Sequence, residues 1–286
     1  MSRSFYLGVD LGGTQLRMAA VTADGQLASE MLSVPTGRDF GPKDLEGHLA
    51  DLTSRVRSHA GDGVAALGFG SAGVIHPGPL TQSDNLPRLN GVDLEVLVKR
   101  VTDCPMRIEN DARCFALAEQ RFGAGRGTEH LCGITLGTGV GCGIVIGGRL
   151  HRGSTSEAGE VWRIPLRGEP LERSVSGAGV VKAYRAAGGA APEGVDAAGV
   201  AERAGQGEAA AQAAWRSFGE DVAFLCECAL SLIDPDRIVL GGSIAKARQL
   251  FEPALHGVLE DRASRIVWAE LGPAAGVIGA AALNIP

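Results

Sequence analysis

The sequence predicts an α/β protein built from two lobes, and three observations support this fold class. The chain has 286 residues, which is about the size of two modest domains. Short apolar runs typical of strands alternate with longer segments of helical periodicity. A strand, a glycine-rich turn and a second strand follow one another at 5–21, and the same succession recurs at 131–146. The recurrence indicates that the two lobes share one plan.

The first lobe is expected to begin with a β-hairpin around the turn at 10–14, and residues 27–34 extend this hairpin into a meander. A helix follows, because Leu45, Leu49 and Leu52 lie on one stripe together with Val56. Gly123 ends a later helix. The expected elements are strands at 5–9, 15–21 and 27–34, a helix at 45–60, strands at 64–69 and 106–108, and a helix at 112–122.

The second lobe is expected to repeat the hairpin and to add long helices. Asp234-Pro235 stops one of these helices, because proline cannot continue a helix. The segment 186–207 is rich in Ala and Gly and predicts only a weakly patterned helical region. The expected elements are strands at 131–136 and 142–146, a helix at 209–233, a strand at 237–240, a helix beginning at 244, and a last helix at 274–283.

Composition excludes several classes of protein. The formal net charge is −6, which is the wrong sign for a surface that binds nucleic acid. The N-terminus shows no signal-peptide pattern, and no window approaches eighteen consecutive apolar residues. We therefore expect a cytoplasmic protein with no membrane or nucleic-acid partner. The six cysteines form no CxxC pair and are expected to be reduced thiols.

One motif has the dinucleotide fingerprint GxGxxG, at residues 68–73. The fingerprint requires a helix directly after the glycines, but Pro77 and Pro79 follow almost at once. The sequence therefore favours a packed strand over a dinucleotide site. The chain also contains no GxxxxGK[ST] phosphate loop.

The two glycine turns, at 10–14 and 137–141, are candidate phosphate-binding loops. Glycines let backbone N–H groups converge on an anion, and the hydroxyls of Thr14 and Thr138 add donors. Asp10, at the end of a strand, could hold Mg²⁺ through its water ligands. Each turn alone could equally be a tight hairpin. Two such turns in one chain favour phosphate.

Further motifs, taken together with the glycine turns, give the chain a resemblance to a known family. Glu109-Asn110-Asp111, Gly159-Glu160 and residues 236–242 occur, with the glycine turns, in the order that is typical of the sequence motifs of ROK-family sugar kinases. The chain resembles this family over nearly its whole length. The resemblance implies an actin-like ATPase (ribonuclease H-like) fold, in which ATP and sugar meet in a cleft between two α/β lobes, and commonly a homodimer. The expected lobes are 1–112, completed by the C-terminal helix 274–286, and 113–273.

The resemblance implies that Asp111 is the catalytic base, which accepts the proton of the attacking sugar hydroxyl, while Asn110 helps to hold the sugar. An aspartate directly before a helix is also a standard N-cap, and the two roles are compatible. Phosphoryl transfer depends mainly on positioning and on neutralisation of charge.

The next family motif departs from the usual pattern at Glu160-Val161-Trp162-Arg163. Arginine stands where the family usually has a zinc-binding histidine, and Trp162 replaces a small residue. The segment 164–170 has no Cys or His, so no zinc is expected. Arg163 could bond a sugar oxygen, Glu160 or an acidic substituent of the substrate, or lie on the surface. Glu172 is a candidate ligand for sugar hydroxyls, with a solvated surface glutamate as the alternative.

The remaining positions complete the expected site. On the sugar side they are Gly73 and Asn85, for which a simple turn is an alternative because Pro87 follows. On the nucleotide side the full set is Asp10, Gly12, Gly13, Thr14, Gln15, Thr138, Gly139, Gly241 and Gly242.

The function expected is transfer of the γ-phosphoryl group of ATP, with Mg²⁺, to a hexose hydroxyl, and glucose is the first candidate acceptor. Fructose, N-acetylmannosamine, another amino sugar or a cyclitol-like analogue stay open as acceptors, and polyphosphate stays open as donor. A sugar-responsive repressor would need a DNA-binding segment, and only four residues precede the first strand. A sugar-binding regulator without catalysis is the remaining class, because of Trp162 and Arg163.

Overall fold

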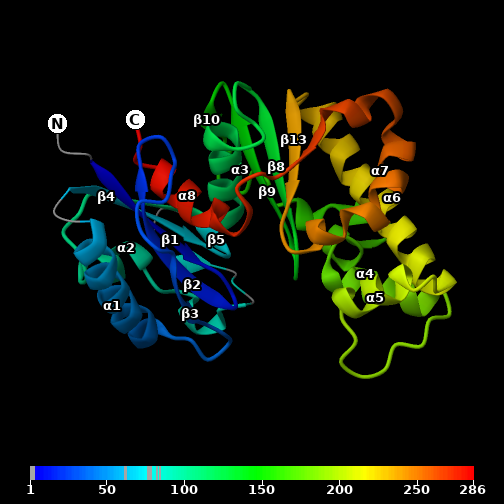
Figure 1. Ribbon diagram of the computed structural model, residues 1–286, viewed down its shortest axis with the longest axis horizontal. Helices are drawn as coiled ribbons and strands as arrows, with labels where there is room; N and C mark the ends of the chain where they lie inside the picture. The colour runs from blue at the N-terminus through cyan, green and yellow to red at the C-terminus, as the bar shows by residue number, and fades with distance from the viewer. Residues whose placement is uncertain (1–3, 61–62, 76–78, 82, 84) are drawn as a thin grey trace. The chain divides into compact units, whose positions relative to one another are not determined.

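The computed structural model describes residues 4–60, 63–75, 79–81, 83 and 85–286, so Pro77 lies outside the described residues. The chain divides into two compact units (Figure 1). The first comprises Met1–Gly127, Gly143–Ala158 and Glu270–Pro286, and the second comprises Thr128–Cys142 and Gly159–Ala269. No described helix is both long and apolar enough to cross a membrane.

The first unit contains a five-stranded sheet with the order β3-β2-β1-β4-β7. Strand β1 pairs antiparallel with β2 and parallel with β4, and β4 pairs parallel with β7. The carboxyl ends of β1, β4 and β7 therefore lie at one edge of the sheet. The strands are β1 (Phe5–Leu11), β2 (Gln15–Thr22), β3 (Leu32–Pro35), β4 (Val64–Ser71) and β7 (Met106–Asn110).

Alternate residues of β1 enter two different cores, as the period of a strand requires. Leu7 and Val9 belong to a cluster that includes Leu45 and Leu49 of α1 (Pro42–Ala60). Tyr6 belongs to a second cluster, formed with helix α8 (Ala275–Ala282). The sheet is thus covered by helices on both faces.

Glycines allow α8 to lie directly on the sheet. A Cβ built at Gly8 would come within 2.0 Å of the Val277 carbonyl oxygen, and one built at Gly68 within 1.7 Å of the Ala280 oxygen. Gly68 and Gly70 both lie inside strand β4. These glycines of the GxGxxG sequence therefore belong to a packed strand, where they admit a helix and a neighbouring side chain.

The second five-stranded sheet has the order β10-β9-β8-β13-β14, which repeats the connectivity of the first. Strand β13 pairs in parallel with β8 and with β14. The repeated order confirms the shared plan expected from the two glycine hairpins. The strands are β8 (Leu131–Leu136), β9 (Val140–Ile146), β10 (Arg149–Leu150), β13 (Arg237–Gly241) and β14 (Ile266–Trp268).

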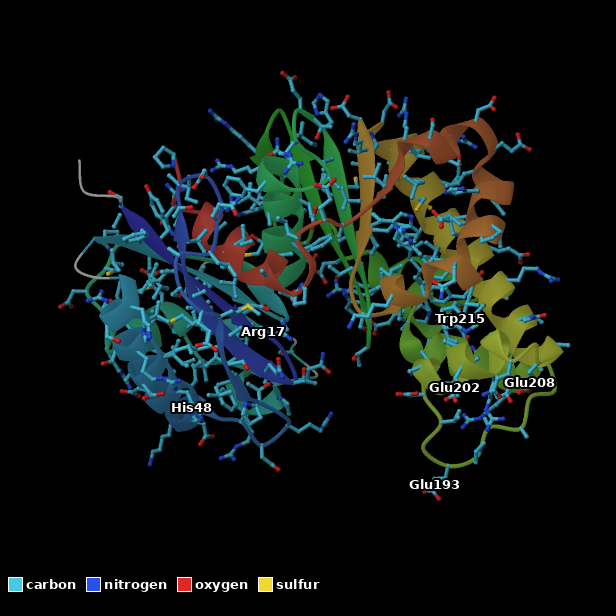
Figure 2. The ribbon with its side chains drawn as sticks, viewed as in Figure 1. Arg17, His48, Glu193, Glu202, Glu208 and Trp215 are labelled. Atoms are coloured by element: carbon cyan, nitrogen blue, oxygen red, sulfur yellow. The ribbon has the colours of Figure 1, made fainter. Side chains whose placement is uncertain are left out.

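Helices of the second unit enclose an aromatic cluster. Trp215, which is labelled in Figure 2, is 1% exposed and packs with Phe218 and Phe251 at ring separations of 5.5 and 5.9 Å. The helices of this unit are α4 (Gly177–Ala186), α5 (Ala197–Gly205), α6 (Ala209–Leu232) and α7 (Glu252–Leu259).

Two expectations for helices need correction, and several short elements were not anticipated. The segment Ile244–Leu250 forms 3₁₀ turns broken at Ala247, and the α-helix begins only at Glu252. The region 186–207 is not one helix: it begins at the last residue of α4 and contains the whole of α5. The sequence did not predict helix α2 (Leu94–Lys99). It also did not predict two small strand pairs, β5 (Val74–Ile75) with β6 (Leu80–Thr81) and β11 (Pro165–Leu166) with β12 (Glu169–Pro170).

The compact units differ from the lobe boundaries expected at residues 112 and 273. Helix α3 (Asp111–Phe122) belongs to the first unit because it packs closely against α8. A Cβ built at Gly279 of α8 would come within 1.8 Å of the Cys114 carbonyl oxygen of α3. The segment Gly143–Ala158 also joins the first unit.

Candidate active site

Two aspartates lie at the carboxyl edge of the first sheet. Asp10 pairs with Gly70 near the end of β1, and Asp111 directly follows β7. Burial, reinforced by the negative charge of Asp111, raises the pKa of Asp10 to about 6. Arg17 opposes this rise, since its Nη1 lies 3.5 Å from Asp10 Oδ2. The structure therefore brings together the two carboxylates to which the sequence assigned chemistry.

The turn before α3 corrects one expectation about Asp111. The N-cap of α3 is Asn110, whose Oδ1 accepts a hydrogen bond from the Arg113 N–H at 3.2 Å. Asp111 is the first helical residue, and its Oδ1 accepts from the Ala112 N–H at 2.8 Å. Asn110 Nδ2 also donates to the Gly73 carbonyl oxygen at 3.0 Å. Two residues expected on the sugar side, Gly73 and Asn110, are thus directly bonded.

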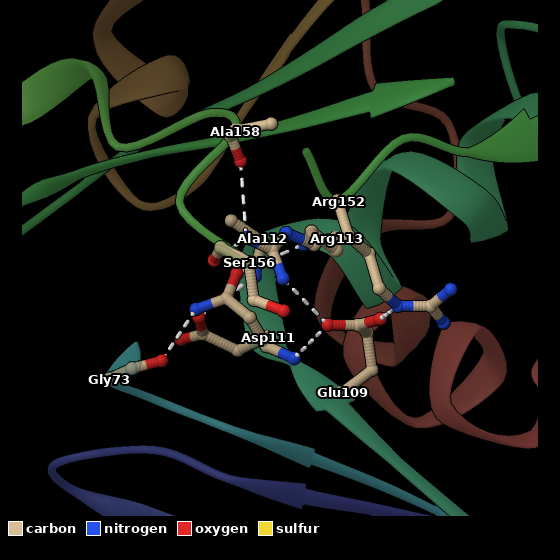
Figure 3. A network of polar contacts seen from close by, with 9 residues as sticks. Gly73, Glu109, Asp111, Ala112, Arg113, Arg152, Ser156 and Ala158 are labelled. Atoms are coloured by element: carbon tan, nitrogen blue, oxygen red, sulfur yellow. Dashed lines mark hydrogen bonds and ion pairs between the residues drawn. The ribbon is translucent and has the colours of Figure 1, made fainter. Parts of the chain in front are cut away.

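Arginine and glutamate side chains surround this turn and support it (Figure 3). Glu109 Oε1 accepts hydrogen bonds from the Asn110 N–H at 2.9 Å and from Arg113 Nη1 at 3.0 Å. The other carboxylate oxygen pairs with Arg152. Glu109 and Arg113 are both buried. Sequence reasoning missed Arg113 and Arg152, and nothing local distinguishes either of them from a surface arginine of a helix or loop.

The first glycine turn is held by residues distant in sequence. Gly12 N–H donates to the Gln15 carbonyl oxygen at 2.9 Å, and Thr36 Oγ1 donates to the Gly12 oxygen at 2.8 Å. A Cβ at Gly13 would come within 2.6 Å of Asn85 Cβ. Asn85, expected on the sugar side, therefore lies against the first glycine turn. The Gln15 side chain accepts hydrogen bonds from Arg17.

In the second unit, Glu172 lies on the second glycine turn. Its Oε2 accepts a hydrogen bond from the Val140 N–H at 3.1 Å. A Cβ at Gly139 would come within 2.3 Å of the same oxygen, so only glycine admits the carboxylate there. Thr138 is exposed at the tip of this turn.

The turn after β13 closes on the same hairpin. Gly242 has a φ of +89°, and a Cβ there would come within 2.3 Å of the Leu136 carbonyl oxygen. Gly241 is the last residue of β13, which pairs with β8 at Thr135. Gly241 and Gly242, two of the glycines expected on the nucleotide side, thus lie beside the strand that leads into the second glycine turn.

The two departures from the family pattern interact with each other. Trp162 Nε1 donates a hydrogen bond to Glu160 Oε2 at 2.6 Å. The Arg163 guanidinium carbon lies 4.7 Å from the centre of the Trp162 ring, in a cation–π arrangement. All three residues belong to the turn around Val161–Arg163. Trp162 therefore orients one carboxylate and one guanidinium at once.

Metal-ligating groups are sparse in the part of the chain that the structure describes. There, no three or more His, Cys, Asp or Glu side chains are grouped so that they could hold an ion. The cysteines are free thiols, and burial raises the pKa of Cys226 well above its ordinary value. The Asp10 carboxylate suits Mg²⁺, which takes one or two carboxylates and keeps several waters.

Nearly the whole chain matches a family model. The model described as ROK family covers residues 6–285. The chain belongs to the ROK family.

Proteins similar to this ROK protein include sugar kinases. The glucokinase of Halalkalibacterium halodurans is 31% identical, over 98% of this chain and 94% of that protein. An N-acetylmannosamine kinase of Escherichia coli is 32% identical, over 84% of each chain. The crystal structure of a ROK glucokinase from Streptomyces griseus, in complex with glucose and AMPPNP, has a TM-score of 0.80. It is 27% identical and covers 98% of this chain and 99% of that one. The fold is the actin-like ATPase fold expected from the resemblance.

Proposed function

We propose that this ROK protein is an ATP-dependent sugar kinase that transfers the γ-phosphoryl group to a hexose hydroxyl, with glucose as the first candidate. The observation that carries the proposal is the placement of Asp111 beside Asp10 at the carboxyl edge of the first sheet. Ligands of open α/β sheets bind at that edge. Asn110 serves as the N-cap of α3, and the Asp111 carboxylate accepts from the Ala112 N–H through Oδ1.

Asp111 would accept the proton of the attacking hydroxyl as the sugar oxygen bonds to the γ-phosphorus and the bond from that phosphorus to the leaving ADP oxygen breaks. General-base catalysis of this kind contributes about 10²- to 10⁴-fold to a rate. Asp10 would hold Mg²⁺ through water, and the ion when bound would neutralise charge on the phosphates. Arg17 lies beside Asp10 and offsets part of the repulsion between the two carboxylates.

The two glycine turns would bind the nucleotide phosphates through backbone N–H groups. In the first turn these residues are Gly12, Gly13, Thr14 and Gln15, and in the second they are Thr138 and Gly139. Gly241 and Gly242 would lie against the adenosine.

The residues that we assign to the sugar hydroxyls are Asn110, with Gly73 and Asn85 supporting it, and Glu160, Arg163 and Glu172. The Val140 N–H fixes one oxygen of Glu172, which leaves the other to accept from a sugar hydroxyl.

The acceptor sugar is the open part of this proposal. The glucokinase and the N-acetylmannosamine kinase named above have nearly equal identity to this chain, 31% and 32%. Fructose, another amino sugar or a cyclitol would use the same base. A homodimer is part of the proposal and is tested by light scattering coupled to size exclusion.

The test is an ATP-turnover assay across a panel of sugars, with polyphosphate as a second donor and Asp111→Asn as control. The proposal predicts turnover with at least one hexose and its loss in Asp111→Asn. Sugar binding by calorimetry without turnover by any donor would instead support a regulator that has lost catalysis.

A further inference from the structure

Arg113 is a charged side chain in the interior of the first unit, and the chemistry described above does not use it. It is 2% exposed. Its Nη2 donates to the carbonyl oxygens of Ser156 and Ala158 at 2.5 and 3.1 Å, and its Nη1 donates to Glu109 at 3.0 Å (Figure 3). One guanidinium therefore joins the end of strand β7 to a segment more than forty positions later in the chain.

The same arginine is bonded to both residues that precede Asp111. Its side chain binds the Glu109 carboxylate, and its backbone N–H donates to Asn110 Oδ1. Glu109 in turn accepts from the Asn110 N–H. These bonds form a closed ring around the turn that places Asp111 at the start of α3.

The segment that Arg113 holds has an unfavourable backbone conformation. Ser156 has a φ of +59°, which a residue with a Cβ adopts rarely and keeps only when its surroundings impose it. Arg152 also belongs to this segment, and it accepts a backbone hydrogen bond from the Ala158 N–H at 3.1 Å while its side chain pairs with Glu109. The anchored segment leads directly into Gly159 and Glu160.

We propose that Arg113 is a positioning residue for sugar phosphorylation. Arg113 lies on α3, the helix that begins with Asp111, and it binds the segment that leads to Glu160. The sugar-binding residue Glu160 and the base Asp111 are therefore both held through this one arginine. This inference rests on the proposed function. Arg113 is buried and bonded to protein groups, so it acts through its neighbours and does not touch the substrate.

The same helix offers a matched control for a purely structural role. Arg121 Nη1 donates to two backbone carbonyl oxygens, those of Ala282 and Ile285, at 3.3 and 2.8 Å. Both arginines thus lie on α3, and each donates to two backbone carbonyl groups outside this helix. Only Arg113 binds a segment that leads to an expected sugar ligand, because the partners of Arg121 lie at the C-terminus.

The experiment compares Arg113→Lys with Arg121→Lys in the full chain. Lysine keeps the positive charge beside Glu109, but it lacks the planar fork that reaches a carboxylate and two carbonyls together. In Arg113→Lys we expect the ratio kcat/KM for sugar to fall by about 10- to 100-fold, as misplacement of a bound substrate does, while KM for ATP is unchanged. Amide hydrogen exchange over 152–163 is expected to accelerate. In Arg121→Lys both properties are expected to match the wild type.

Two results would overturn the inference: equal loss of kcat/KM in both variants, or unchanged exchange over 152–163 in Arg113→Lys. If that variant does not fold, Glu109→Gln weakens the same ion pair and must change exchange over 152–163 in the same direction. If the wild type phosphorylates no sugar, the proposed function fails, and hydrogen exchange alone then decides whether Arg113 holds this segment.

Discussion

Gly276 of helix α8 lies directly against Asp10: a Cβ built at Gly276 would come within 2.7 Å of the Asp10 Cγ. The last helix of the chain therefore forms one wall around the carboxylate at the end of its first strand. The wall leaves room for the Asp10 side chain only because residue 276 is glycine. The same wall helps to bury Asp10, which is 15% exposed.

Gly276→Ala should displace the Asp10 carboxylate. We expect kcat/KM to fall by about tenfold or more, because small displacements of a metal-binding carboxylate disturb alignment of the phosphates. Steady-state kinetics at saturating and limiting Mg²⁺ measure this. Gly47→Ala is the control, since Gly47 is an exposed residue of α1 with nothing within 4 Å of a built Cβ. It should leave activity unchanged and stabilise the protein by about 0.5–1 kcal/mol.

Asp10 should make stability depend on pH. Its pKa is raised from 3.8 to about 6 in the fold, which corresponds to a contribution of about 3 kcal/mol to the free energy of unfolding. Because the folded state binds the proton more tightly, this contribution is complete below pH 3.8 and is lost as the pH rises through 6. Asp10→Asn should therefore remove that slope and raise Tm at pH 7.5 in the absence of Mg²⁺, while it abolishes kinase activity. Thermal melts of both proteins from pH 4 to 8 measure the slope, and parallel curves would contradict the assignment.

Trp162→Phe should weaken sugar binding while it keeps an aromatic ring beneath Arg163. The substitution removes the 2.6 Å hydrogen bond to Glu160, and hydrogen bonds to charged groups contribute about 1.5–3 kcal/mol. We expect KM for the sugar to rise by about tenfold, with KM for ATP constant. Trp268→Phe removes an equivalent bond to Glu252 and should leave both constants unchanged. Equal effects of the two substitutions would exclude a sugar-binding role for the Trp162 cluster.

Asn110→Ala should cost stability as well as activity. The Asn110 side chain caps α3 and donates to the Gly73 oxygen, and loss of an N-cap typically costs about 1 kcal/mol. Urea unfolding measures this change. Asp111→Asn, one position later, should leave the midpoint almost unchanged, so the pair separates the cap from the base. A larger stability loss in Asp111→Asn would reverse these assignments.

Features that a few neighbouring residues encode could be predicted from the sequence. Both glycine hairpins and the strand Arg237–Gly241 follow from local patterns of apolar residues and turns. The helix expected from Ile244 failed because Ala247 has non-helical dihedrals (φ −97°, ψ 17°) that no local proline or glycine signals.

Features that depend on residues far apart in the chain could not be predicted in this way. Gly276 acts on Asp10 across most of the sequence, and Arg113 acts on Ser156 through a hydrogen bond between positions 43 apart. The choice between Asn110 and Asp111 as helix cap was set by where β7 ends, which a residue pattern defines poorly.

The most direct test of the account is a single-turnover measurement of phosphoryl transfer from γ-labelled ATP to glucose, or to the best sugar of the panel, by wild type and Asp111→Asn. The account predicts that the wild type forms labelled sugar phosphate and that Asp111→Asn forms it about 10²- to 10⁴-fold more slowly, with the dissociation constants of both ligands preserved. Transfer at the same rate in the two proteins would contradict Asp111 as the base, and with it the mechanism proposed for this ROK protein.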